Sequence, residues 1–245
     1  MTTAPTTDPH PLAAELAPTG TLRAAINLGN PVLAHGDEHS PGGVTADLAE
    51  ELGRRLGVPV ELLPVDAARK SFALMTQGRA DLCFLAVDPA RAEKVAFSAP
   101  YLVIEGVYVV PARSPLRTAE DVDRPGVRVG VKEGSAYDLH LSRELTHAQV
   151  VRGTEGTDVF LEQRLEVGAG IRQPLTRLVE DRTDLRLLEG AFMQIRQAVG
   201  IPRRRSDEAV AWLGSTVGHL GTSGFVAAAL QRAGQDPALA VGGSA

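Results

Sequence analysis

Short apolar segments that suit strands alternate with helical segments along residues 22–87, and this alternation restricts the possible folds more than any other feature. The apolar segments occupy 22–26, 58–65 and 80–87, and the segments between them, 45–56 and 67–76, carry helix signals. Thr45 is predicted to cap the first helix, which ends before Gly57. Parallel strands need a crossover connection, which a helix supplies, so this stretch predicts a parallel α/β unit.

The second half of the chain repeats the alternation. Strands are predicted at 127–131, 149–151 and 167–171, helices at 134–145, 157–165 and 174–180, and a further extended segment at 192–201. Ser206 is predicted to cap a long C-terminal helix. The segment 106–111 between the halves is strand-like and not a Gly/Ser linker. We therefore expect two α/β lobes, with the chain crossing from one to the other on an ordered strand.

Composition is that of an ordinary globular protein and argues against several classes. Hydrophobic residues make up 44% of the 245 residues and charged residues 22%. The net charge of −5 does not favour binding to nucleic acid or attraction to an anionic membrane. The one cysteine, Cys83, excludes an internal disulfide and a multi-cysteine zinc site. Its apolar surroundings predict a buried, inert thiol.

Motifs for cofactors and metals are weak, so no cofactor and no metal site are expected. The sequence has no Walker A loop and no Gly-x-Gly-x-x-Gly after a strand. His35 and His39 lie in a Pro/Gly-rich loop, and without a helix their spacing of four residues does not place the two side chains on one face. The densest basic patch, Arg203–Arg205, reads either as a solvated turn before a helix or as a phosphate-binding patch, and it is too short for a nucleic-acid arm.

The N-terminal segment has neither the basic nor the apolar region of a secretory signal. No apolar stretch approaches the length of a transmembrane helix, so no membrane insertion is expected. We therefore expect a cytoplasmic protein. Residues 1–19 are predicted to be a disordered leader, and residues 236–245 a tail.

An ordered set of short motifs resembles the type II periplasmic (solute-)binding proteins, in particular the amino-acid-binding family 3. Gly43–Gly57 resembles the first-helix signature of that family, and Gln77–Leu82 its turn into the third strand. Asp88-Pro-Ala-Arg91, followed by Phe97-Ser-Ala-Pro-Tyr101, is similar to the family's Thr-Pro-Glu-Arg and Phe-Ser-x-Pro-Tyr. Gly126–Ser135 resembles the start of the second lobe.

The resemblance implies an α/β fold of two lobes joined by two crossing strands, with a ligand cleft between the lobes. Lobe 1 would comprise residues 20–105 plus 191–235, and lobe 2 residues 106–190. Such proteins bind a small molecule, often as the substrate-binding component of an ABC transporter. The sequence does not specify the oligomeric state.

The resemblance also points to ligand-binding residues in the first lobe. Arg91 matches the family arginine that grips a ligand carboxylate, a task that suits the forked guanidinium. Asn27 and Asn30 follow the first strand, and each either contacts ligand or only shapes the turn. Ala86 and Asp88 stand where the family carries hydroxyl groups for the ligand carboxylate, and Ala68 stands where it carries a stacking aromatic, with Lys70 close by.

In the second lobe, Ser135 begins a helix and either holds an anion or serves only as the helix cap. Arg172 lies close to the position where amino-acid binders carry an aspartate for the ligand ammonium, and residues 168–174 contain no acid. Arg172 therefore either attracts a second anionic group or is structural. Together these departures favour a small anionic, carboxylate-bearing ligand over an ordinary α-amino acid.

Binding without chemistry is the first interpretation, and no catalytic residue is assigned. The alternative is a cytoplasmic lyase or dehydratase on the same fold, because Pro125–Val131 also resembles the second lobe of cyclohexadienyl dehydratases. In that case the acid or base would come from Asp88, Lys70, Glu133 or Glu189. A third interpretation is an interaction protein with a vestigial cleft.

Overall fold

The computed structural model describes residues 10–242. The chain divides into two compact units. Unit 1 contains the residues up to Leu102 and those from Gln197 onward, and unit 2 is Val103–Arg196. The chain passes between them at the start of β7 (Leu102–Pro111) and within β12 (Met193–Pro202). Crossing on ordered strands is what the strand-like segment 106–111 led us to expect.

The sheet of unit 1 is built around its first strand. β1 (Leu22–Asn27) pairs in parallel with β4 (Val60–Val65) on one side and with β5 (Leu82–Ala86) on the other. β12 adds antiparallel to β5, and β6 (Val95–Phe97) adds antiparallel to β12. All five residues of β5 are buried, as expected for an apolar strand covered on both faces.

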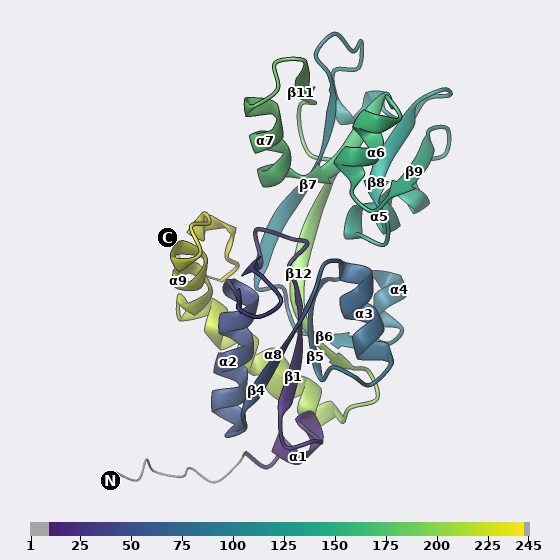
Figure 1. Ribbon diagram of the computed structural model, residues 1–245. Helices are drawn as coiled ribbons and strands as arrows, with labels where there is room; N and C mark the ends of the chain where they lie inside the picture. Colours follow the sequence, from purple (N-terminus) through teal and green to yellow (C-terminus); the bar gives the residue numbers. More distant parts are fainter. Residues whose placement is uncertain (1–9, 243–245) are drawn as a thin grey trace. The chain divides into compact units, whose positions relative to one another are not determined.

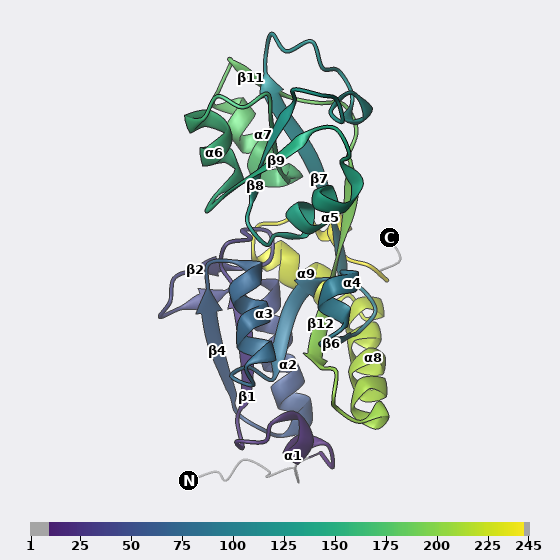
Figure 2. The same ribbon diagram turned by 90° about the vertical axis from the view of Figure 1, so that its right-hand side faces the viewer.

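Helices cover both faces of this sheet. The chain leaves β1 for β4 through α2 (Val44–Leu56) and then returns past β1 to β5 through α3 (Ala68–Thr76). Right-handed crossovers made in opposite directions place their helices on opposite faces. α2 and α3 accordingly lie on the two sides of the sheet (Figure 1). The C-terminal helices α8 (Asp207–Thr222) and α9 (Phe225–Arg232) complete the unit, and α8 packs beside β6 (Figure 2).

The predicted start of one helix differs in the structure. Thr45 does not cap α2, because the helix begins one residue earlier and its N-cap is Gly43, whose φ of 102° suits glycine. Thr45 is buried in the first turn, and its hydroxyl donates to the Leu33 carbonyl at 3.2 Å. The long C-terminal helix is interrupted at Gly224, which has a φ of 79°. Ser206 caps α8 as predicted, accepting from the Ala209 amide at 3.1 Å.

Part of the predicted leader folds onto unit 1. Residues 1–9 lie outside the described residues, but Ala13–Leu16 form α1, and Leu16 is buried. The His10 amide donates to the Leu56 carbonyl at 3.0 Å. Burial of the apolar side chains in this segment stabilises its contact with unit 1. The Thr/Pro-rich sequence before it gave no sign of this burial. Near the other terminus, Pro237–Leu239 form a short 3-10 helix within the predicted tail.

Unit 2 repeats the plan of unit 1. β8 (Arg128–Lys132) lies between β9 (Gln149–Gly153) and β10 (Val167–Ile171), and both pairings are parallel. β7 adds antiparallel to β10, and β11 (Leu185–Leu187) adds antiparallel to β7. The helices are α5 (Ala136–Glu144), α6 (Gly156–Glu162) and α7 (Arg172–Glu180). Phe160, Leu165 and Leu175 form its core with valines of β7.

Further short elements include the 3-10 helix Ala119–Asp121, which follows β7. α4 (Pro89–Ala92) follows β5, and the strands β2 (His35–Gly36) and β3 (Pro41–Gly42) form a small hairpin. Among the described residues, no helix is long and apolar enough to cross a bilayer. The predicted α/β class is confirmed in both units, and in each unit one strand, β1 or β8, lies between two parallel strands.

Candidate functional site

The residues singled out in the sequence gather at one kind of place in each unit. In an open α/β sheet, ligands bind beyond the carboxyl ends of the strands, where the strand order reverses. In unit 1 this point lies between β1 and β5. Asn27 ends β1, and Asp88 and Arg91 follow β5. All three side chains are buried, although each is polar or charged.

Arg91 is the most deeply buried of the candidate cations, with 3% of the residue exposed. It lies in the short helix α4, and its Nη1 donates to the Ala86 carbonyl at 3.2 Å. Burial lowers the pKa of Arg91, whereas the nearby Asp88 charge raises it. Asp88 also caps α4, accepting from the Ala90 amide at 2.9 Å, with Pro89 at the first helical position. The structure thus brings Arg91 and Asp88 together at the end of β5.

Two further side chains belong to this part of unit 1. Cys83 is buried, and burial raises its pKa to about 12, so the thiol is uncharged at neutral pH. Gln197, on β12, lies opposite Ala86 in the antiparallel pairing with β5. Its Oε1 is buried and has no hydrogen-bond partner among the described residues. A buried acceptor without a partner is rare in folded proteins. Sequence reasoning missed Gln197, although a polar residue directly before the buried apolar run 198–202 is a detectable signal.

The two asparagines use their side-chain oxygens within their own turns. Asn27 Oδ1 accepts from the Gly29 amide at 3.1 Å, and Asn30 Oδ1 accepts from the Val32 amide at 3.2 Å. This is the turn-shaping role that asparagine often has. Lys70 is on the exposed side of α3, where its Nζ lies 2.7 Å from Asp66 Oδ2. Lys70 therefore has an acid next to it that the prediction did not consider.

In unit 2, Ser135 is the N-cap of α5. Its hydroxyl accepts from the Asp138 amide at 3.0 Å, and Asp138 Oδ2 in turn accepts from the Gly134 amide at 2.8 Å. Asp138 is buried and also contacts Arg152, with 3.0 Å between Oδ1 and Nε. Ser135 therefore caps α5. Because its hydroxyl oxygen only accepts in this bond, the hydroxyl hydrogen can still donate to another group.

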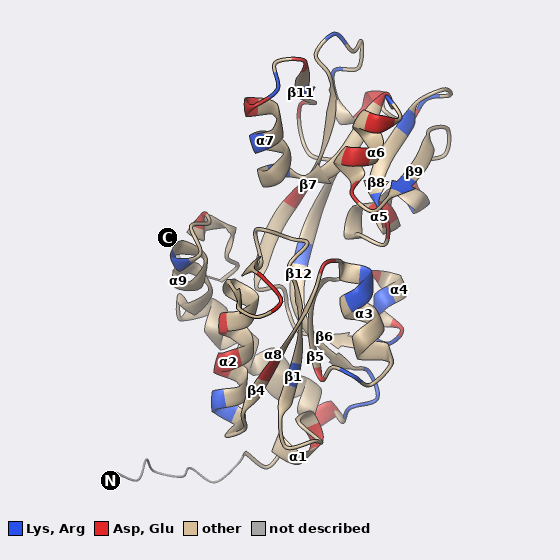
Figure 3. Cartoon of the chain, viewed as in Figure 1, with Lys and Arg blue, Asp and Glu red and all other residues tan. Residues whose placement is uncertain are grey.

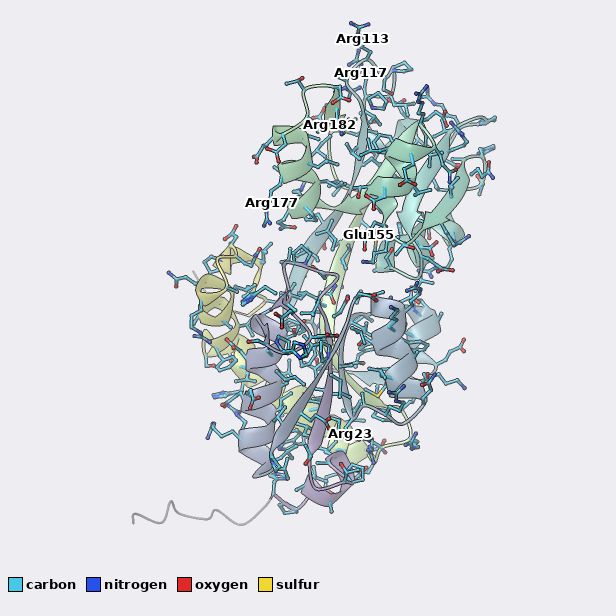
Figure 4. The ribbon with its side chains drawn as sticks, in the orientation of Figure 1. Arg23, Arg113, Arg117, Glu155, Arg177 and Arg182 are labelled. Carbon is cyan, nitrogen blue, oxygen red and sulfur yellow. The ribbon has the colours of Figure 1, made fainter. Side chains whose placement is uncertain are left out.

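Lys132 ends β8 and forms an ion pair with Glu155, which precedes α6. Lys132 is buried, and Glu155 is labelled in Figure 4. Burial is the main cause that raises the pKa of the neighbouring Tyr137, and the Glu155 charge adds to it. Neither Lys132 nor Glu155 was selected from the sequence, because their contact joins strand ends 23 residues apart.

Arg172 begins α7 and pairs with an acid, contrary to the expectation that none lies near it. Its Nε contacts Glu105, and its Nη2 donates to the Gly190 carbonyl at 3.1 Å. Glu105 comes from β7, which runs antiparallel to β10 and brings Gly106 opposite Ile171. The expectation rested on residues 168–174 alone, whereas the acid comes from a strand 67 residues away in the sequence.

Within the described residues, no group of three or more histidine, cysteine or acidic side chains is placed to hold a metal ion. The arrangement in unit 1 is instead suited to reversible recognition. A buried guanidinium at the end of β5 offers directed N–H donors, and the low polarity around it strengthens each interaction with an acceptor.

Comparison with known proteins shows which family the chain matches. The model of the bacterial extracellular solute-binding proteins, family 3, matches residues 22–235. Over 139 residues, 56% of this chain, the sequence is 27% identical to the virulence sensor protein BvgS of Bordetella bronchiseptica. That segment is 11% of BvgS, so this chain spans only a small part of the length of the curated relatives it matches.

Solved structures are similar over most of the chain. A variant of ArgBP from T. maritima has a TM-score of 0.72 at 24% identity, covering 90% of this chain and 97% of that one. An ancestral amino acid-binding protein, AncCDT-1, a precursor of cyclohexadienyl dehydratase, has a TM-score of 0.70 at 20% identity, covering 90% and 98%. These similarities confirm the predicted two-lobed type II periplasmic binding fold.

Proposed function

The chain belongs to the bacterial extracellular solute-binding proteins, family 3, and we propose that it binds a small organic molecule through a carboxylate that Arg91 recognises. The observation that carries the proposal is the buried Arg91 guanidinium just past the carboxyl end of β5. That position is where ligands bind on sheets of this topology. The predicted location of the ligand between two lobes stays a prediction.

The chemistry of Arg91 supports a carboxylate as its partner. A guanidinium has five N–H donors in a fixed plane and can pair with both oxygens of a carboxylate while keeping a bond to the Ala86 carbonyl. Asp88 stabilises the positive charge in the absence of ligand. The buried Oε1 of Gln197, on the strand next to Ala86, adds an acceptor for a ligand N–H or O–H group.

The other candidate cations give less support to a ligand with several negative charges. Lys70 contacts Asp66, Arg172 contacts Glu105, and Lys132 contacts Glu155. Each positive charge is thus largely offset by an acid of its own unit. We therefore propose a ligand with one carboxylate as its required group. Because related structures include an amino acid-binding protein, α-amino acids belong in the first screen beside monocarboxylates and dicarboxylates.

A calorimetric binding screen tests the proposal with the wild-type chain and two variants of Arg91. The probes are arginine, glutamine, succinate and pyruvate, each compared with the amide or ester that lacks its carboxylate charge. Arg91→Lys keeps the positive charge but loses the planar pair of N–H donors, and Arg91→Gln loses both the charge and that pair of donors. We expect one carboxylate probe to bind, its amide to bind far more weakly, and Arg91→Lys to lose about 10- to 100-fold in affinity, as for a charged hydrogen-bonded contact.

Arg79→Lys in unit 1 is the matched control, because Arg79 is exposed and the same side-chain change is made. Ligand-induced shifts in melting temperature, each measured against the same variant without ligand, separate lost binding from lost stability. Equal affinity of wild type and Arg91→Gln for the bound carboxylate would overturn the proposal. Any probe that binds is then incubated with the protein and examined for turnover.

A further inference from the structure

Unit 1 carries a hollow that the candidate site does not use. It has a volume of about 350 Å³ and includes Met75 and Pro202, which are buried. Its exposed residues include Glu93, Lys94, Arg203 and Arg204. A volume of this size falls in the range of small-molecule sites. The hollow therefore combines a partly apolar lining with charged groups.

The charge of this hollow is opposite to that of the whole chain. It has three cations and one acid, whereas the chain has 25 basic and 30 acidic residues and a net charge of −5. Within the part of the chain that the structure describes, the side chains of Lys94 and Arg204 form no ion pair and no hydrogen bond. Arg204 instead lowers the pKa of its neighbour Arg205 by repulsion, after the larger effect of burial.

The nearby buried acid does not neutralise this cluster. The Asp81 carboxylate is held by Arg23, with 2.9 Å between Oδ2 and Nε, and it lies 3.6 Å from Arg205 Nη2. The Asp81 carboxylate is thus engaged with Arg23 and Arg205. The loop between β12 and α8, which contains Arg203–Arg205, is a blue stretch on unit 1 in Figure 3. An excess of positive charge therefore remains at the hollow.

Backbone pairing holds the cations of the hollow together although they are far apart in sequence. The Arg203 amide donates to the Lys94 carbonyl at 2.9 Å, and Arg203 Nη1 donates to the Ala92 carbonyl at 3.1 Å. The pairing of β6 with β12 continues to this point, with Pro202 opposite Val95. The rigid backbone keeps these cations near one another, so an anion needs to order only their side chains when it binds.

We propose that the hollow of Lys94, Arg203 and Arg204 binds an oligophosphate group, either free or as the tail of a nucleotide. Guanidinium groups pair with phosphate oxygens in the same forked geometry as with carboxylates, and a lysine adds a point charge. Several adjacent cations favour a group with several negative charges over a monocarboxylate. The volume and the buried residues Met75 and Pro202 favour a small molecule over an acidic protein surface. This site is independent of Arg91.

Calorimetry with the full chain tests this site with inorganic triphosphate, ATP and poly-glutamate as probes. We expect triphosphate to bind at one site, more weakly as salt is added. The double variant Lys94→Gln/Arg204→Gln should weaken this binding at least about tenfold, because it removes two charged contacts. Equal affinity for ATP and triphosphate would assign recognition to the phosphates alone, and tighter binding of ATP would assign the site to a nucleotide.

The matched control is Arg113→Gln/Arg117→Gln, which removes two exposed positive charges from the loop after β7 in unit 2 (Figure 4). It should leave triphosphate affinity unchanged. An equal loss in both double variants would reduce the effect to general charge and overturn the proposal. Absence of triphosphate binding by the wild type would also overturn the proposal. Binding of poly-glutamate alone would overturn it as well and would assign the surface to an acidic protein partner. All four side chains are exposed, so unchanged melting temperatures are expected.

Discussion

Gly156 provides a sharp test of how closely unit 2 is packed around its candidate residues. It is buried at the first position of α6, directly after Glu155. A Cβ added there would lie 2.9 Å from the Lys132 nitrogen, 3.1 Å from the Ala169 oxygen and 3.1 Å from the Val131 carbonyl carbon. All three atoms belong to the backbone of β8 or β10. A methyl group at this position therefore cannot be accommodated by rotating a side chain.

The expected magnitude for Gly156→Ala follows from two opposing effects. Overpacking of a close-packed site costs about 1–3 kcal/mol. Alanine regains up to ~1 kcal/mol over glycine in a helix. We expect a net destabilisation of about 1 kcal/mol, which corresponds to a melting temperature lower by roughly 2–4 °C for a chain of this size. The displaced helix start should also separate Glu155 from Lys132.

The assay is differential scanning calorimetry, which can resolve separate transitions of the two units. The matched control is Gly218→Ala, the same chemical change at an exposed position in α8 where nothing lies within 4 Å of the added Cβ. That variant should be more stable than wild type by up to ~1 kcal/mol. If Gly156→Ala melted at or above the wild-type temperature, the reasoning from close approach would be refuted.

Three further predictions concern other described residues. Burial raises the pKa of Cys83 to about 12, so a thiol reagent at pH 8 should leave the native protein unlabelled and label it in denaturant; rapid native labelling would contradict this. Hydrogen bonds from Arg54, then from Arg55, lower the pKa of Glu51 from 4.5 to about 2 against the effect of burial. The ionised Glu51 therefore adds ~1 kcal/mol, after screening, to the free energy of unfolding above pH 4.5, and this stability should be lost as pH falls towards 2. In Glu51→Gln the stability measured by denaturant unfolding should no longer fall over this pH range by that amount. An unchanged pH dependence would count against the prediction. A double-mutant cycle of Arg172→Gln and Glu105→Gln, read by denaturant unfolding, should give a coupling of at most ~1 kcal/mol because both side chains are over a third exposed.

Local sequence determined much of the fold. The alternation of apolar strands and helical segments predicted both α/β units, because side-chain periodicity is a property of neighbouring residues. Asp88 and Pro89 mark the start of α4, and Ser135 and Ser206 mark the starts of α5 and α8, because each cap is formed within a few residues. Local signals were weaker at α2, where Gly43 supplies the cap position that Thr45 was predicted to fill.

The candidate site could be predicted only in part. Motif positions located Arg91 and Asp88 after β5, and the structure brings them together. Gln197 was missed because it reaches this place through the antiparallel pairing of β12 with β5. The acid beside Arg172 was missed in the same way, since Glu105 arrives on β7.

Sequence by itself therefore determined the types and order of the main elements, the caps of α5 and α8 and the resemblance to the family. Tertiary structure decided which acids pair with which cations, Glu105 with Arg172 and Glu155 with Lys132, and it placed Arg203 beside Lys94 through a backbone hydrogen bond. The physical reason is that these contacts depend on strand order and register across tens of residues. Order and register are set by burial and hydrogen bonding over the whole unit, which no short segment contains.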